Sequence, residues 1–182
     1  MSPMSIAPSR YVRLSVVDGL SALNKDFLNS AKELVDPQEA AARFVIDLRD
    51  VTKAEQCLLL FPHHGHNFRV GFGVGTDMDN IRSNLELNDR GRTTVLTTML
   101  ENNIDVPAMD FSKLHARSRP DFLAEFMPKA QMMLMLPLLD RHYIAGILLL
   151  TWNKANSLTQ FEVLLLKELR TACSTYLLKA GL

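Results

Sequence analysis

Three histidines stand close together in the run Pro62-His63-His64-Gly65-His66. Imidazole is a common ligand for zinc, copper and nickel, so the run invites a metal-binding interpretation. Adjacent histidines on a short turn rarely converge on one ion, and this run holds no Asp, Glu or Cys. We therefore expect an exposed polar connection between two strands and no metal site.

The chain has two cysteines, Cys57 and Cys173, and each stands among apolar residues. A catalytic thiol needs a positioned base, and neither cysteine belongs to a recognisable pair of this kind. The chain also lacks a Gly-x-Ser-x-Gly elbow. Two thiols without a CxxC spacing are typical of a reduced, cytoplasmic protein. The residues thus predict no catalysis of the chain's own.

A glycine-rich run, Gly71–Thr76, resembles a phosphate-binding loop only in part. The dinucleotide-binding pattern requires glycine where Thr76 stands, and it requires a helix to begin there within a βαβ unit. We interpret the run as an irregular, flexible stretch after a strand.

A second candidate lies at Asn88–Thr94, where the polar sequence suits the start of a helix. The free N–H groups of such a start, with Arg90 or Arg92, could hold an anionic ligand. A capped helix start with solvated arginines is the simpler alternative, because helix starts are commonly polar.

Methionine and phenylalanine side chains are frequent between positions 99 and 135. Methionine packs adaptably, so these side chains could line a pocket beneath a cover formed by residues 88–127, or simply fill the core. Asp110 and His115 would supply polar groups in the pocket, although a surface position is the alternative for each. The candidate pocket residues are Phe72, Arg90, Arg92, Asp110, Phe111, His115, Phe122, Met133 and Met135.

Helices that would position these residues follow from the spacing of apolar side chains. Steps of three and four residues predict one helix from Val16 to about Leu34 and a second from Pro37 to about Val51. The sequence Thr159-Gln160-Phe161-Glu162 is a capping box and predicts a last helix to about Leu178. Helices are also expected near Asn88 and at Pro120–Met127, with a loop from 105 to 120.

Strands follow from short apolar or alternating runs. Such runs predict strands at 57–61, 67–72, 132–139 and 143–152, the last two joined by the turn Asp140-Arg141-His142. Short turns between consecutive strands imply antiparallel pairing, and strands that are apolar on both faces must be covered on both sides. The predicted fold class is α+β, an antiparallel sheet sandwiched between a layer of the terminal helices and a looser helix and loop layer. We expect a flexible N-terminal segment, residues 1–15, and a single domain, residues 16–182.

Composition limits the function further. The 182 residues are 47% hydrophobic and 22% charged, which is typical of a globular domain. Twenty basic and twenty acidic residues cancel, so no electrostatic signal for nucleic acid or an anionic membrane is visible. The longest apolar runs have the length of a strand, and a membrane-spanning helix would need about 20 such residues.

Several of these segments together resemble a GAF domain, the small-molecule sensing module of many signalling proteins. The resemblance rests on Leu136-Pro137-Leu138, on Ile144–Leu148 after a polar turn, and on Leu158–Glu162 before a leucine-rich helix. A narrower resemblance, to the GAF-like domains that follow HDOD domains in bacterial signalling proteins, rests on Leu23-Asn24, Ala54–Phe61 and Val106–Asp110. These resemblances imply a cytoplasmic regulatory domain that binds a small ligand or partner and signals through its terminal helices to an output domain or protein.

The chain also departs from the better-known members of that family. It lacks the Asn-Lys-Phe-Asp-Glu signature of cyclic-nucleotide-binding members, and Lys113–Ala116 offers no cysteine for a bilin. No cofactor is therefore assigned. Two alternatives stay open, namely a ligand-free scaffold for dimerisation or docking and a thiol-dependent enzyme of the same fold.

The first and last helices carry more apolar positions than one sheet face needs. We therefore expect a parallel homodimer bundled through these helices. The candidate interface residues are Val16, Leu20, Leu23, Phe27, Leu165, Leu169, Ala172 and Tyr176.

Overall fold

The computed structural model describes residues 15–33, 36–64, 67–88, 106–110, 121–141, 143–155 and 158–179. The helices are α1 (Val16–Lys32), α2 (Pro37–Thr52), α3 (Met78–Asn84), α5 (Asp121–Phe126) and α6 (Gln160–Lys179). The strands are β1 (Gln56–Pro62), β2 (Asn67–Gly75), β3 (Glu86–Asn88), β4 (Val106–Asp110), β5 (Met132–Asp140) and β6 (Tyr143–Trp152).

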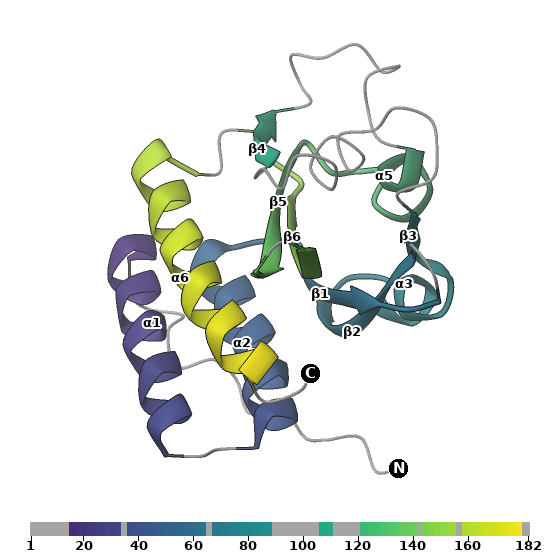
Figure 1. Cartoon of the computed structure of the whole chain (residues 1–182). Coiled ribbons are helices and arrows are strands. Elements are labelled where there is room, and N and C mark those ends of the chain that lie inside the picture. Colours follow the sequence, from purple (N-terminus) through teal and green to yellow (C-terminus); the bar gives the residue numbers. More distant parts are fainter. Residues whose placement is uncertain are drawn as a thin grey trace.

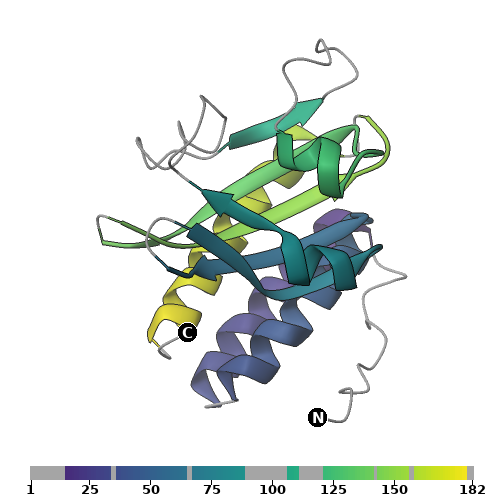
Figure 2. The same cartoon turned by 90° about the vertical axis from the view of Figure 1, so that its right-hand side faces the viewer.

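The strands form one six-stranded sheet in the order β3-β2-β1-β6-β5-β4, with antiparallel pairing throughout (Figures 1 and 2). β5 and β6 pair along their whole length, from Met132 opposite Trp152 to Asp140 opposite Tyr143. The predicted α+β class and the predicted antiparallel neighbours are confirmed.

Side chains of β5 alternate between two buried clusters. Leu134 and Leu136 face the cluster beneath the long helices, whereas Met133 and Met135 face a second cluster on the opposite side of the sheet. All four are fully buried. The prediction that the central strands are covered on both faces is therefore confirmed.

Three helices form the layer on the first face (Figure 1). α2 packs on β1 and β2, α6 packs on β5, and α1 packs on α6 and α2. At their meeting point the Phe27 ring contacts Phe44 at 4.8 Å and Tyr176 at 5.3 Å between centroids, both edge to face. One aromatic side chain from each helix thus joins the three.

The starts of these helices follow from local hydrogen bonding. The side chains of Ser15 and Asp36 accept hydrogen bonds from the N–H groups of Asp18 and Gln38. Thr159 and Glu162 form the predicted capping box, with bonds of 3.2 and 2.6 Å. Ser15 therefore belongs to α1 as its cap, while residues 1–14 of the predicted N-terminal segment lie outside the described residues.

The structure corrects the sequence interpretation in two places. β2 continues through Gly75, and α3 and β3 follow where only an irregular stretch was predicted. β4 at Val106–Asp110 is a strand within the predicted loop, and it pairs with β5. Both missed strands are short sheet edges, and β4 also contains a proline, so neither shows a long alternating pattern. The helix predicted near Asn88 falls outside the described residues apart from Asn88 itself, which ends β3.

Candidate functional site

The second face is the side of the sheet that carries Met133 and Met135. Its described cover comes from α3, β3 and α5, which contribute Ile81, Leu87 and Leu123. The floor of this face is apolar over most of its area. Its fully buried members on β1, β5 and β6 are Leu58, Leu60, Met133, Met135, Ile147 and Leu149.

One end of the second face is polar. By strand alternation Gln56 shares this face with Leu58, and Thr151 shares it with Leu149. Thr151 stands opposite both Gln56 and Met133 in the strand pairing, so the three form one row across the sheet. Both polar residues are buried.

The polar side chains of this row bond one another. The Thr151 hydroxyl donates to Gln56 Oε1, and Gln56 Nε2 donates to Thr76 Oγ1 at 3.0 Å. The row therefore places uncharged donors and acceptors beside Met133. Burying these polar groups costs little free energy because they are hydrogen-bonded to one another. Gln56 and Thr151 were not among the predicted site residues, although both continue the strand alternation of Leu58 and Leu149.

The structure places the predicted pocket residues unequally. Met133, Met135 and Phe122 lie together on the second face. Phe72 does not, because it packs with Phe61 against the cluster beneath the long helices, with ring centroids 6.2 Å apart. Its assignment to this pocket was wrong, since its position in β2 points it to the other side of the sheet.

The remaining pocket candidates cannot be placed in the same way. The backbone of Asp110 ends β4 opposite Met132. Arg90, Arg92, Phe111 and His115 lie outside the described residues, so their role stays a prediction.

The predicted interface residues lie mostly in the core of one protomer. Leu20, Leu23, Phe27 and Leu169 are buried there, because α1 packs along α6 and α2. Val16, Leu165 and Tyr176 are partly buried against the same cluster, and Ala172 is also half-buried. Among the described residues of the two helices, the large apolar side chains that are exposed are others, namely Leu28 on α1 at 49% and Phe161 and Leu164 on α6 at 57% each.

The cysteines occupy the core beneath the long helices. Cys57 on β1 and Cys173 on α6 are fully buried in the same cluster. Burial raises the pKa of both thiols far above the ordinary value, and the neighbouring Cys173 adds to the effect at Cys57. A thiol held neutral and away from solvent is a poor nucleophile, so the geometry counts against thiol chemistry.

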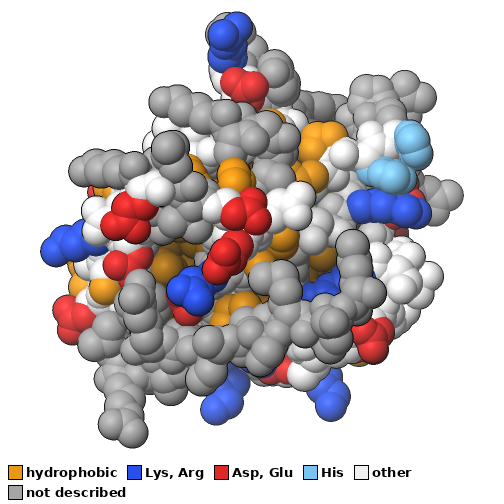
Figure 3. Space-filling model, turned by 90° about the horizontal axis from the view of Figure 1, so that it is seen from below, with side chains coloured by type: hydrophobic (Ala, Val, Ile, Leu, Met, Phe, Trp, Pro, Cys, Tyr) orange, Lys and Arg blue, Asp and Glu red, His pale blue; other side chains and the backbone are white. Residues whose placement is uncertain are grey.

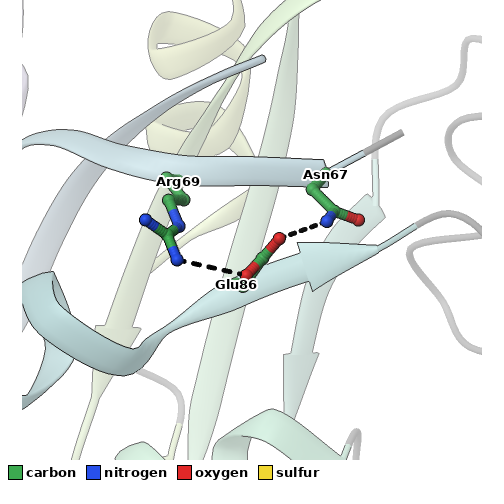
Figure 4. Close-up of polar contacts among 3 residues, drawn as sticks. All are labelled: Asn67, Arg69 and Glu86. Carbon is green, nitrogen blue, oxygen red and sulfur yellow. Dashed lines mark hydrogen bonds and ion pairs between the residues drawn. The ribbon is translucent and has the colours of Figure 1, made fainter. Parts of the chain in front are cut away.

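Polar groups on the surface form ordinary contacts. Arg69 and Glu86 make an exposed ion pair at 3.5 Å across β2 and β3, and Asn67 also donates to Glu86 (Figure 4). His63 and His64 are exposed with ring centroids 4.2 Å apart. Within the described ranges, His, Cys, Asp and Glu side chains form no group of three suited to a metal ion.

Charge is dispersed on the face shown in Figure 3, where acidic and basic side chains are interspersed with apolar ones.

Among the helices that the structure describes, none combines the length and apolar character needed to span a bilayer.

Comparison with solved structures identifies the fold. A GAF domain from an Acinetobacter phosphoenolpyruvate-protein phosphotransferase aligns with this chain at TM-score 0.68 and 15% sequence identity. The alignment covers 90% of this chain and 93% of the Acinetobacter domain. The phycoerythrobilin-bound GAF domain of a cyanobacterial phytochrome aligns with this chain at TM-score 0.72 and 7% sequence identity. The alignment covers 90% of this chain and 97% of the phytochrome domain. The chain has the GAF fold.

An enzyme shares the same architecture. The free methionine-R-sulfoxide reductase of Neisseria meningitidis, solved with its substrate, matches 100% of this chain and 98% of its own, with TM-score 0.69 and 12% identity. No protein-family model matches the chain, and no curated protein matches it. The narrower resemblance to domains that follow HDOD domains stays a prediction.

Proposed function

We propose that this chain is a cytoplasmic regulatory domain that binds a small ligand on the second face and signals through its terminal helices. The main support is the second face itself, which joins an adaptable apolar floor at Met133 and Met135 to the polar row of Gln56 and Thr151. Ligand sites commonly combine apolar walls with a few placed polar groups. Structures with the same fold include bilin-bound sensory domains and a segment of a methyl-accepting chemotaxis protein.

The chemistry of the polar row suggests the kind of ligand. Gln56 and Thr151 offer amide and hydroxyl groups and no charge. They suit a ligand that presents an uncharged polar group at this end and an apolar or aromatic body over Met133 and Met135. Arg90 and Arg92 remain the candidates for an anionic group.

A thermal-shift screen with nucleotides, amino acids and aromatic cofactors tests the proposal, because a ligand that binds only the native state raises Tm. Each hit is repeated with Thr151→Val, which keeps the shape of the side chain and removes its hydroxyl, and with Thr175→Val as a control on the exposed side of α6. We expect the shift, measured from each variant's own ligand-free Tm, to shrink for Thr151→Val alone. Hits whose shift is equal in all three proteins would place binding elsewhere.

A second function, dimerisation without a ligand, is supported by the exposed side chains of α6. We propose that the interface of a parallel homodimer is centred on Phe161 and Leu164, since Leu20, Leu23 and Leu169 are buried in the protomer. Native mass spectrometry distinguishes the two functions. A dimer with no bound molecule and no response to any compound favours the scaffold, and a co-purifying molecule favours the sensor.

We propose no catalysis by the chain. Both thiols are buried with raised pKa values. Thiol-dependent turnover that is lost on replacing Cys57 or Cys173 by serine would overturn this part of the proposal.

A further inference from the structure

β5 separates α6 from the second face. α6 packs on β5, whereas α2 packs on β1 and β2. The side chains of Leu134 and Leu136 support α6 from one side of β5, and Met133 and Met135 project to the other. β5 therefore contacts α6 on one side and contributes to the second face on the other.

Arg170 adds a polar link at the same place. Its Nη1 donates to the Pro137 carbonyl oxygen at 3.1 Å, and its Nε lies 3.4 Å from the Lys167 carbonyl oxygen one turn earlier in α6. The guanidinium is partly buried at this contact. A hydrogen bond from a charged donor that is sheltered from water is stronger than a neutral one.

Pro137 stands just past the end of the described pairing between β5 and β4. It lies two residues beyond Met135, which is where the described pairing of β5 with β4 ends. Beyond that residue, β5 is paired with β6 on one side. Arg170 therefore contacts β5 over the stretch that β4 does not pair with in the described chain.

Other helices are joined to the chain near their own strands in a similar way. Arg49 of α2 donates to the Glu55 carbonyl before β1 at 3.1 Å, and Arg82 of α3 donates to the Gly73 carbonyl of β2 at 2.6 Å. The helices are therefore linked to different parts of the sheet. The contact made by Arg170 concerns α6 and β5.

We propose that Arg170 couples the position of α6 to that of β5, so that a change at Met133 or Met135 on the second face alters the stability of the C-terminal half of α6. Arg170 is a positioning residue in this arrangement. Its regulatory use rests on the proposed function, but the coupling itself needs no ligand.

Hydrogen exchange of the full chain, followed by mass spectrometry, tests the coupling with side-chain changes in place of a ligand. Met135→Ala perturbs β5 from the second face. Leu58→Ala is the matched control, because Leu58 is equally buried on the same face but lies on β1, beneath α2. We expect Met135→Ala to speed exchange in peptides covering 170–177 by about fivefold or more relative to α2, the lower range of typical coupling between sites. Leu58→Ala should not.

The double variant Arg170→Met/Met135→Ala tests the role of Arg170. Arg170→Met keeps an unbranched apolar stem and removes the donors, so adding Met135→Ala to it should give little further change in 170–177. Arg170→Lys, which keeps a charged donor, should restore part of the response. If one of the alanine variants does not fold, Met135→Val and Leu58→Val give the same comparison with a smaller cavity.

Two results would overturn the inference. One is equal acceleration of 170–177 by Met135→Ala and Leu58→Ala, which would show only general loosening. The other is an undiminished effect of Met135→Ala in the Arg170→Met background. Neither result bears on whether the second face binds a ligand, since no ligand enters the experiment.

Discussion

Phe27 and Leu28 are neighbours on α1 with opposite surroundings, and replacing each by alanine separates a core role from an interface role. Phe27 is 5% exposed and contacts the rings of Phe44 and Tyr176, whereas Leu28 is 49% exposed. The apolar spacing of the first helix predicted Phe27 at a dimer interface. The structure instead makes it the centre of the contact among α1, α2 and α6.

The expected cost of Phe27→Ala follows from that burial. Removing a buried phenylalanine costs about 3–5 kcal/mol, and the two edge-to-face ring contacts place this site at the upper end of that range. For a chain of this size, a loss of about 5 kcal/mol lowers Tm by roughly 10–20 °C. Leu28→Ala removes an exposed side chain from a helix that favours alanine, so its effect should stay within about 0.5 kcal/mol.

Urea unfolding of both variants, at two protein concentrations about a hundredfold apart, measures the difference. We expect Phe27→Ala to lower the midpoint equally at both concentrations with an unchanged m-value, because the lost contacts lie within one protomer. A variant that unfolds like the wild type at low concentration, but loses stability only at high concentration, would refute this reasoning. That result would place Phe27 at a dimer interface.

Three further predictions follow from single features. Gly75→Ala should lower the free energy of unfolding by more than about 2 kcal/mol, because Gly75 has φ of +140° and an added Cβ would lie 2.3 Å from the Glu55 carbonyl oxygen. Chemical unfolding measures this loss, and a loss below about 1 kcal/mol would contradict the prediction. Thr159→Ala should cost about 1 kcal/mol through loss of the α6 cap, and Thr171→Ala on the exposed side of the same helix is its control in the same assay. The unfolded chain releases the thiol protons of Cys57 and Cys173 above the ordinary thiol pKa of 9.0, whereas the folded chain retains them. The contribution of these thiols to the free energy of unfolding should therefore be fully present below pH 9 and decrease above it. The decrease should reach about 1.4 kcal/mol per pH unit for each thiol. The double variant Cys57→Ala/Cys173→Ala should show a smaller fall between pH 9 and 10.5, and an identical fall would refute the assignment.

The sequence predicted the central elements because their signals are strong. β5 and β6 are long apolar runs, and α2 and α6 begin with capping residues that act locally. α3, β3 and β4 were missed because short elements at the edge of a sheet carry few apolar positions. The strands β3 and β4 depend on pairing with β2 and β5, which no local pattern reveals.

The sheet face of a residue was predictable only where burial follows strand alternation. Met133 and Met135 lie on the second face, but Phe72 lies on the other, since its face depends on the register of β2 against β1. That pairing contains an irregularity between Leu59 and Leu60. Alternation along β1 and β6 would have selected Gln56 and Thr151, had polar residues at strand ends been considered as part of the floor.

The outermost strands have a consequence for how molecules of this protein can associate. β3 has three residues, and β4 has five with a proline and a break in its pairing. In the described chain, β3 pairs only with Asn67–Arg69 of β2, and β4 pairs with β5 only as far as Met135. An incoming strand that added at β3 or β4 could therefore pair over only a few residues, and pairing along the whole of β2 or β5 would require one of these two short strands to detach first.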